Sequence, residues 1–165
     1  SRGAAAEMAS FKALADILSQ ESFALPSFTD SGGPMPGTGN KGLVKGPAPS
    51  NEEERATLAA LYCALMVDRS LAAVKSKGDI IVDGPFAKNP VFLSCLAGLR
   101  PKQKVLASQL RDGTTQGAMV LALMGEDGKL PELALSLDRI DPKAPALMAR
   151  YAAKWRELAA EQTEG

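Results

Sequence analysis

The sequence predicts an α/β fold in which helices pack on a small mixed sheet. Short β-branched runs alternate with amphipathic segments in the middle of the chain, which is typical of layered α/β proteins. The length of 165 residues suits one domain with a sizeable core. Two strands stand out, which is few for a complete sheet, and the chain begins Ser1-Arg2-Gly3 without an initiator methionine. We therefore expect an incomplete domain from a longer protein.

Composition excludes several classes of function. Acidic and basic side chains balance at 19 each, which does not indicate nucleic-acid binding or binding to an anionic membrane. Histidine is absent, so catalytic triads and metal sites that use histidine are excluded within this chain. Cys63 and Cys95 lie in distant apolar segments and are expected to be reduced thiols of a cytoplasmic protein. No apolar run approaches the ~20 residues that span a bilayer, and no secretory signal is visible.

The first third of the chain is expected to be a helix followed by a long loop. Ala4–Gln20 is Ala-rich and predicts a helix, and Phe23–Pro26 predicts a short extended piece. The apolar stripe expected on this helix is Met8, Phe11, Leu14, Ala15 and Leu18. Residues 27–50 predict a Gly/Pro-rich surface loop. Its Gly37–Gly42 segment fits G-x-G-x-x-G, but prolines precede it and at best a short strand follows, so we reject a dinucleotide fingerprint.

Residues 51–125 are expected to form the α/β core. A long helix should start at Ser50 or Asn51 and run to about Lys77, stopped by Gly78. Its core-facing stripe is Leu58, Leu61, Tyr62, Leu65 and Met66. Lys104–Ala107 predicts a short strand. Gln116–Met124 predicts a helix capped by Thr114 or Thr115, and the small residues at its start suit close packing on another backbone.

The last part of the chain is expected to end in a helix. Gly125–Gly128 predicts a turn, and Leu130–Asp141 is compatible with either a short helix or an extended segment. Residues 146–161 predict a terminal helix. Its apolar seam would be Leu147, Tyr151, Trp155 and Leu158, and its cations Arg150, Lys154 and Arg156 would form a solvated face.

The chain is organised around the stretch from Gly78 to Gly98. Ile80–Val82 predicts a buried strand, the Gly84-Pro85 turn ends it, and an apolar segment with helical spacing follows. A strand, a glycine turn and a helix often hold a phosphate or nucleotide in α/β proteins, although an ordinary connection has the same form. Asn89 before Pro90 suits a helix N-cap, and Asp83 suits a role in stabilising the turn.

The order of these elements resembles the C-terminal domain of the FGGY carbohydrate kinases. The similar features are a long helix beginning Arg55-Ala56, the strand that ends at Asp83-Gly84, and the later Gln116–Met119 segment. Tyr151 and Trp155 also resemble the closing helix of that family. The resemblance covers most of residues 20–160. It implies a ribonuclease H-like fold of the actin-like ATPase superfamily, with residues 1–165 as the C-terminal portion of a sugar kinase.

The same resemblance implies a nucleotide site at the glycine turn. Gly84, Pro85, Phe86 and Asn89 occupy positions that in the family face the adenosine part of ATP. Pro85 and Phe86 depart from the small residues of the family, and Pro85 has no N–H to donate. Phe86 could either stack on adenine or fill its space. Ala59-Ala60 also replace the usual Glu-Gly.

The resemblance implies that this segment is not a complete catalyst. In the family, the phosphate loop, with its Asp-x-Gly-Thr motif, and the catalytic Asp lie in earlier parts of the chain, so the catalytic residues are expected outside these residues. The implied cofactors are ATP and Mg²⁺, and the implied partners are a sugar or polyol and a missing N-terminal domain. Two alternatives remain open: a non-catalytic actin-like binding module with a degenerate site, and a small standalone α/β domain.

Overall fold

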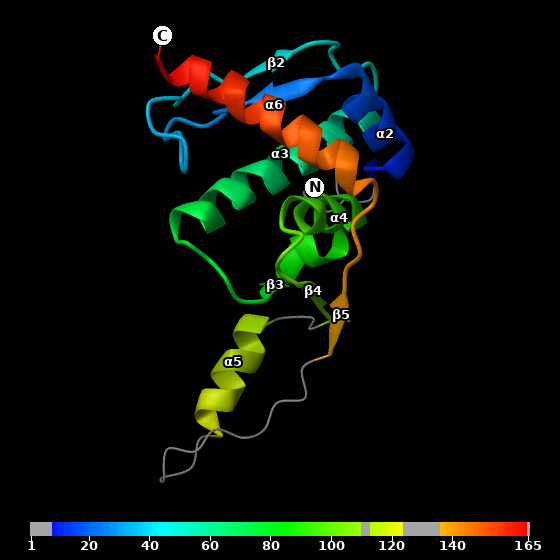
Figure 1. Cartoon of the computed structure of the whole chain (residues 1–165). Coiled ribbons are helices and arrows are strands. Elements are labelled where there is room, and N and C mark those ends of the chain that lie inside the picture. The colour runs from blue at the N-terminus through cyan, green and yellow to red at the C-terminus, as the bar shows by residue number, and fades with distance from the viewer. Residues whose placement is uncertain (1–7, 110–112, 124–135, 165) are drawn as a thin grey trace.

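The computed structural model describes residues 8–109, 113–123 and 136–164, and it has helices packed on small sheets (Figure 1). The helices are α2 (Phe11–Gln20), α3 (Glu52–Ala73), α4 (Pro90–Leu99), α5 (Gly113–Ala122) and α6 (Pro145–Glu164), and the 3₁₀ helix η1 (Gly84–Lys88) precedes α4. The strands are β1 (Phe23–Leu25), β2 (Leu43–Lys45), β3 (Ile80–Val82), β4 (Val105–Ser108) and β5 (Leu137–Arg139). The predicted α/β class with a small mixed sheet is confirmed.

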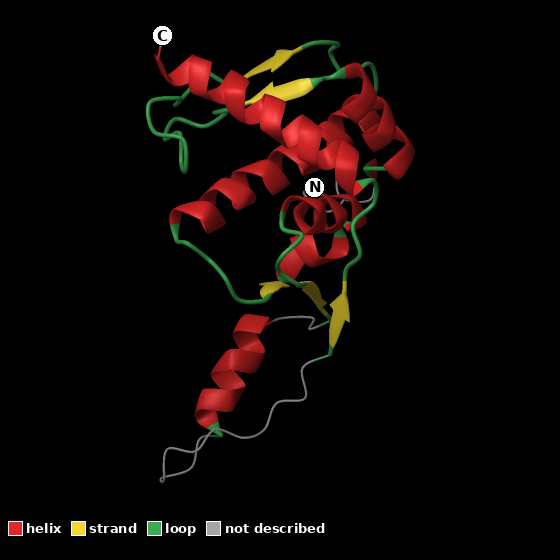
Figure 2. Cartoon of the chain, in the orientation of Figure 1, coloured by secondary structure: helices red, strands yellow, loops and turns green. Residues whose placement is uncertain are grey.

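The strands form two separate sheets at opposite ends of the helical body (Figure 2). Strands β1 and β2 pair antiparallel. Strand β4 lies between β3, to which it is parallel, and β5, to which it is antiparallel. The prediction of two clear strands was too low, because three-residue strands are too short to show an alternating pattern. For Leu130–Asp141 the sequence left a short helix and an extended segment as alternatives. The segment contains strand β5 at Leu137–Arg139, and residues 130–135 lie outside the described residues.

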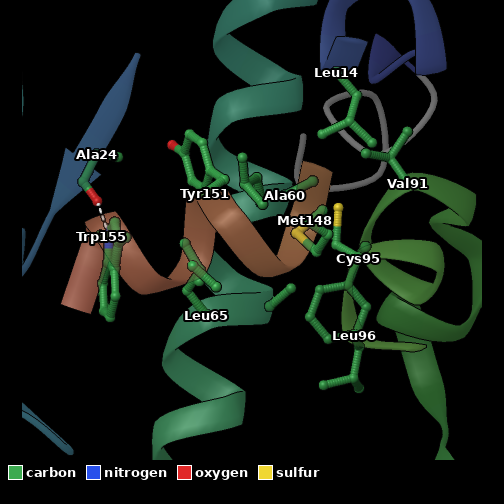
Figure 3. Packing of buried hydrophobic residues seen from close by; sticks show 14 of the residues in the cluster. Leu14, Ala24, Ala60, Leu65, Val91, Cys95, Leu96, Met148, Tyr151 and Trp155 are labelled. Atoms are coloured by element: carbon green, nitrogen blue, oxygen red, sulfur yellow. Dashed lines mark hydrogen bonds between the residues drawn. The ribbon is translucent and has the colours of Figure 1, made fainter. Parts of the chain in front are cut away.

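Helix α4 forms the centre of the core. All residues from Val91 to Gly98 are buried, because α3 covers one side of the helix and α6 another. A Cβ at Gly98 would lie 3.1 Å from Cγ of Met148, so the absent side chain allows α4 and α6 to approach closely. Figure 3 shows Cys95 and Leu96 of α4 facing Met148 of α6. A helix that is apolar on every face is thus covered on every face.

Helix α6 is attached to strand β1, which lies far from it in the sequence. The indole of Trp155 donates to the carbonyl of Ala24 at 2.7 Å (Figure 3), and the hydroxyl of Tyr151 donates to the carbonyl of Ser22. The Tyr151 ring stacks on Phe23 with centroids 4.5 Å apart. Burial of Tyr151 raises the pKa of its hydroxyl, which therefore stays a donor. The predicted seam is confirmed at Tyr151, Trp155 and Leu158, whereas Met148 replaces the exposed Leu147.

Asp68 of α3 joins three helices through its buried carboxylate. Its Oδ1 lies 2.7 Å from Nε of Arg100, which caps α4, although that N–H is not aimed at the oxygen. Its Oδ2 accepts a hydrogen bond of 3.1 Å from Arg156 of α6. Arg100 also donates to the backbone carbonyl of Asp68. Arg156 is 44% exposed, as expected for the solvated face of α6, and it also pairs with a carboxylate that is only 9% exposed.

The predicted bounds of the first two helices need correction. Helix α2 begins at Phe11 rather than Ala4, because Ser10 caps it by accepting from the N–H of Ala13; residues 4–7 lie outside the described residues. Its buried residues are Ala13, Leu14, Ile17 and Leu18, while Met8 and Phe11 of the expected stripe are exposed. Helix α3 ends at Ala73 instead of Lys77, since the left-handed residue is Lys75 (φ 53°) rather than Gly78.

The predicted start of α3 is confirmed, and the helix is both long and apolar. Asn51 is the N-cap and accepts from the N–H of Glu54 at 2.9 Å. The backbone N–H of Ser50 donates to the Glu54 carboxylate, which lowers the pKa of that side chain. By length and composition α3 could also cross a membrane, contrary to the expectation that no such run exists. Core helices pass the same test, and α3 buries Leu58, Leu61 and Leu65.

The predicted loop at residues 27–50 folds on itself. Backbone hydrogen bonds join Ser27 N–H to the carbonyl of Thr38 and Gly42 N–H to the carbonyl of Ser27, at 3.0 and 2.8 Å. Met35 and Thr38 are buried, so the loop is only partly a surface excursion. No helix begins within Gly37–Gly42, where a dinucleotide fingerprint would require one.

Helix α5 is displaced toward the N-terminus relative to its predicted bounds and ends at Ala122, whereas α6 extends beyond its predicted bounds at both ends. Helix α5 begins at Gly113, so Thr114 and Thr115 lie inside it rather than capping it, and the predicted turn at 125–128 is outside the described residues. Helix α6 runs from Pro145 to Glu164 and contains the predicted 146–161. Strand β4 at Val105–Ser108 is one residue displaced from its prediction.

Removing the charge of the Asp68 carboxylate should strongly lower the stability of the fold. We expect Asp68→Asn to lower the free energy of unfolding by about 3 kcal/mol, because two arginines lose a shared counter-charge at a buried position. Asp16→Asn, at an exposed position of α2, is the control and should change stability by less than about 0.5 kcal/mol. Denaturant unfolding of both variants checks the prediction, and equal stabilities would contradict it.

The two free cysteines predict a difference in thiol reactivity. Burial raises the pKa of Cys95 to about 12, and it also raises the pKa of the half-buried Cys63. At neutral pH an alkylating reagent should therefore modify Cys63 slowly and Cys95 only after denaturation, since the thiolate is the reactive form. Peptide mapping by mass spectrometry measures both rates. Labelling of Cys95 as fast as Cys63 in the folded protein would show that the core around α4 opens.

Candidate functional site

The candidate site is the connection from strand β3 through η1 to α4. Ile80 is buried, and its N–H donates to the carbonyl of Lys104 at 2.8 Å. Ile81 is 53% exposed, so β3 is only half buried, whereas the sequence predicted a fully buried strand. Successive side chains of a strand point to opposite faces of the sheet, so Ile81 lies on the face opposite to the buried Ile80, which explains the difference. The turn that follows is therefore accessible from solvent.

Gly84 begins η1 in a left-handed backbone conformation with φ 69°. A Cβ placed there would have no described heavy atom within 4 Å. The glycine is therefore required by the backbone conformation and not by close packing. The open space beside it is what a ligand approaching the backbone would need.

Pro85 and Phe86 occupy the exposed side of the turn. Pro85 stands in the first turn of η1, where its missing N–H costs no helical hydrogen bond. Phe86 is 47% exposed, and its ring lies against that of Phe92 with centroids 4.6 Å apart and planes tilted by 43°. One part of the Phe86 ring is thus fixed by the core of α4, and the other part remains available to a flat ligand.

Asn89 is the N-cap of α4, as predicted. Its Oδ1 accepts from the N–H of Phe92 at 3.0 Å, and its own N–H donates to the carbonyl of Phe86 at 3.1 Å. The residue is 6% exposed. Its side-chain amide N–H₂ has no acceptor among the described residues. The cap therefore uses the amide oxygen and leaves the amide donors for another partner.

Asp83 does not stabilise the turn in the expected way. It precedes η1 with an extended backbone, and its exposed side chain makes no capping hydrogen bond. The carboxylate also has no hydrogen bond or ion pair with any residue that the structure describes. The sequence signal was the strand end followed by glycine, which indicates a turn but not the direction of the side chain.

Helix α5 does not meet the candidate turn through its small residues. Gly117 and Ala118 are exposed, and a Cβ on Gly117 would touch nothing within 4 Å, so the predicted close packing is absent for this residue. Figure 1 shows α5 extending away from the helical body beyond β3 and β4. Met119 and Leu121 of this helix, and Leu123 directly after it, are 60–65% exposed.

The turn offers hydrogen-bond donors and a flat aromatic surface. Its donors are the Asn89 amide and the backbone, its flat surface is Phe86, and Gly84 leaves room for approach. Within the described ranges, no group of three or more Cys, Asp or Glu side chains could hold a metal.

Comparisons with known proteins show a family. The chain matches the family model of the carbohydrate kinase FGGY C-terminal domain over residues 1–131. Among solved structures it is similar to a carbohydrate kinase from Novosphingobium aromaticivorans, with 29% sequence identity and a TM-score of 0.70. That match covers 90% of this chain and 30% of the kinase. No curated protein sequence gives a significant match.

The chain therefore spans less than a third of the length of that solved kinase. The family model matches most of the sequence, and the structural match extends over nearly all of it. The chain belongs to the FGGY carbohydrate kinase family, in which it corresponds to the C-terminal domain.

Proposed function

We propose that this chain is the C-terminal portion of an ATP-dependent kinase that phosphorylates a hydroxyl of a sugar or polyol. The chain contributes the adenosine side of the nucleotide site through Gly84, Pro85, Phe86 and Asn89. The observation that carries the proposal is the open glycine turn between β3 and α4 in a chain of this kinase family. The domain would be part of a ribonuclease H-like fold of the actin-like ATPase superfamily, in a cytoplasmic protein.

Each residue of the turn has a distinct task in this proposal. Gly84 lets the backbone approach the nucleotide, because it has no side chain and adopts a positive φ. The half-exposed ring of Phe86 stacks on adenine, and the ring of Phe92 packs against Phe86 and holds it in place. The Asn89 amide donates to a ring nitrogen of adenine, since its oxygen is held by the N–H of Phe92. Pro85 lacks a donor and only shapes the turn.

The remaining parts of the reaction come from outside this chain. Phosphoryl transfer needs a group that accepts the proton of the hydroxyl, a cradle for the phosphates, and Mg²⁺ held by carboxylates. The phosphate loop would come from an N-terminal domain that closes on the substrate, and the catalytic Asp from a part of the protein upstream of these residues. The exposed apolar side chains Ile81, Met119, Leu121 and Leu123 support the proposal, because a longer protein would cover them. In this proposal the chain has three parts. Its loop is residues 27–50, its nucleotide-facing core is residues 51–125, and its terminal helix is residues 146–161.

Asn89 allows the cap and the ligand contact to be separated. Asn89→Asp keeps an oxygen for the N–H of Phe92 but loses the amide donors. We expect this variant to weaken binding of MgATP to the full-length protein about tenfold, because one hydrogen bond to the base is lost. Its stability should stay within about 0.5 kcal/mol of wild type. Calorimetric titration and denaturant unfolding measure the two effects.

Asn89→Ala is the matched control. It loses both functions, so it should weaken MgATP binding to a similar degree and also lower the free energy of unfolding by about 1 kcal/mol. Binding of MgATP to Asn89→Asp with the affinity of wild type would show that Asn89 is only a cap.

A second candidate function is a non-catalytic actin-like binding module, and Pro85 favours it. A proline at this position removes an N–H from the backbone that would face the ligand, and Phe86 packs on Phe92 as a core residue would. Here the aromatic ring would fill the space of adenine, so nucleotide would bind weakly or not at all.

Phe86→Ala distinguishes the two functions by the sign of its effect. If Phe86 stacks on adenine, the variant should weaken MgATP binding by about tenfold, the loss of one stacking contact. If the ring blocks the site, its removal should strengthen binding. Calorimetry on the full-length protein reads the direction, and tighter binding by Phe86→Ala would overturn the kinase proposal in favour of the binding module.

A further inference from the structure

A second hollow lies between α3, α6 and the long loop, away from the glycine turn. It has a volume of about 340 Å³. Its walls are formed by Pro34, Met35 and Pro36 of the loop, Arg69 of α3, and Trp155, Arg156 and Ala160 of α6. No residue of β3, η1 or α4 is among them. The size is that of a site for a small ligand.

Positive charge exceeds negative charge around this hollow. Arg69 and Arg156 line it, and Arg100 lies behind Arg156 on the same carboxylate. Across the described residues, Asp68 is the single carboxylate within ion-pair distance of these three arginines. Two positive charges are therefore left without a counter-charge. The excess lies next to walls that are otherwise apolar.

Arg69 is the unusual member of this group. Its Nε–H is buried and has no acceptor among the described residues. The whole guanidinium also makes no ion pair with any described side chain, although the residue is half buried. A buried donor without an acceptor is costly, and a charged one more so. Nothing in the packing of α3 accounts for a cation held in this way.

We propose that this hollow binds a small organic phosphate monoester. The charge of such a group at neutral pH, about −1.5 to −2, matches the two unpaired positive charges. The terminal N–H groups of the Arg69 guanidinium would donate to two phosphate oxygens, which is the geometry that arginine prefers. Arg156 would add its remaining donors. The apolar walls from Pro34, Pro36 and Trp155 would cover the organic portion of the ligand.

Calorimetric titration of the full-length protein with phenyl phosphate tests this site. We expect saturable binding that Arg69→Met weakens about tenfold or more, because charge-assisted hydrogen bonds are lost. Arg150→Met, which removes an exposed cation of α6 paired with Glu21, is the matched control and should bind like wild type. Benzoate should bind more weakly than phenyl phosphate, since it carries one charge.

Several results would overturn the proposal. These are no saturable binding of phenyl phosphate, equal affinity in Arg69→Met and wild type, or benzoate that binds as tightly as phenyl phosphate. If Arg69→Met does not fold, Arg69→Lys decides the matter, because an ammonium cannot form the two parallel bonds and should weaken binding about fivefold. MgATP affinity should be unchanged in the Arg69 variants, so failure here is distinguishable from failure of the proposed nucleotide site.

Discussion

The hydrogen bonds from α6 to the first strand hold together parts of the chain that have little stability alone. Strands β1 and β2 form a pair of three-residue strands, and such a ribbon is marginal in water. The indole of Trp155 and the hydroxyl of Tyr151 satisfy two carbonyls at this ribbon, Ala24 and Ser22, while their rings are buried against it. The same helix covers α4 through Met148. Detaching α6 would therefore expose both the ribbon and the central helix.

The Asp68 carboxylate imposes a second constraint, which fixes the direction of α6 as well as its position. Arg100 at the end of α4 and Arg156 in the second half of α6 converge on one buried side chain of α3. A buried carboxylate must be paired, so the helices have to meet at this point. Among the described residues, Asp68 pairs with Arg100 and Arg156 and not with Arg69, so the hollow beside Arg69 remains positive. The position of α6 and the positive charge of the hollow thus both depend on how Asp68 is paired.

The candidate nucleotide turn depends on the same core from the other side. Helix α4 is buried along Val91–Gly98, so its N-terminus and the preceding turn are held in place by packing that lies outside the turn. Asn89 links the two, because its oxygen caps the helix while its amide donors remain at the turn. Phe92 likewise belongs to the core and supports Phe86. A ligand site of this kind needs few residues of its own, since the scaffold supplies the rigidity.

By itself, the sequence determined the class of fold, the position of the long helices, the strand–turn–helix around Gly84, the Asn89 cap and the likeness to the kinase family. These features arise from local spacing, from cap residues and from short motifs, all of which are readable within a few positions. It did not determine the early end of α3, the exposure of Ile81, the pairing of the strands near either end, or the ion pair between Arg156 and Asp68. Only the tertiary structure decided these, because each depends on a partner distant in the chain: β4 beside β3, α6 beside β1, and Asp68 beside Arg156. Arg69 shows this most clearly, since an arginine in an amphipathic helix is ordinarily solvated, and only the fold reveals that Nε of this half-buried side chain is buried with no acceptor among the described residues.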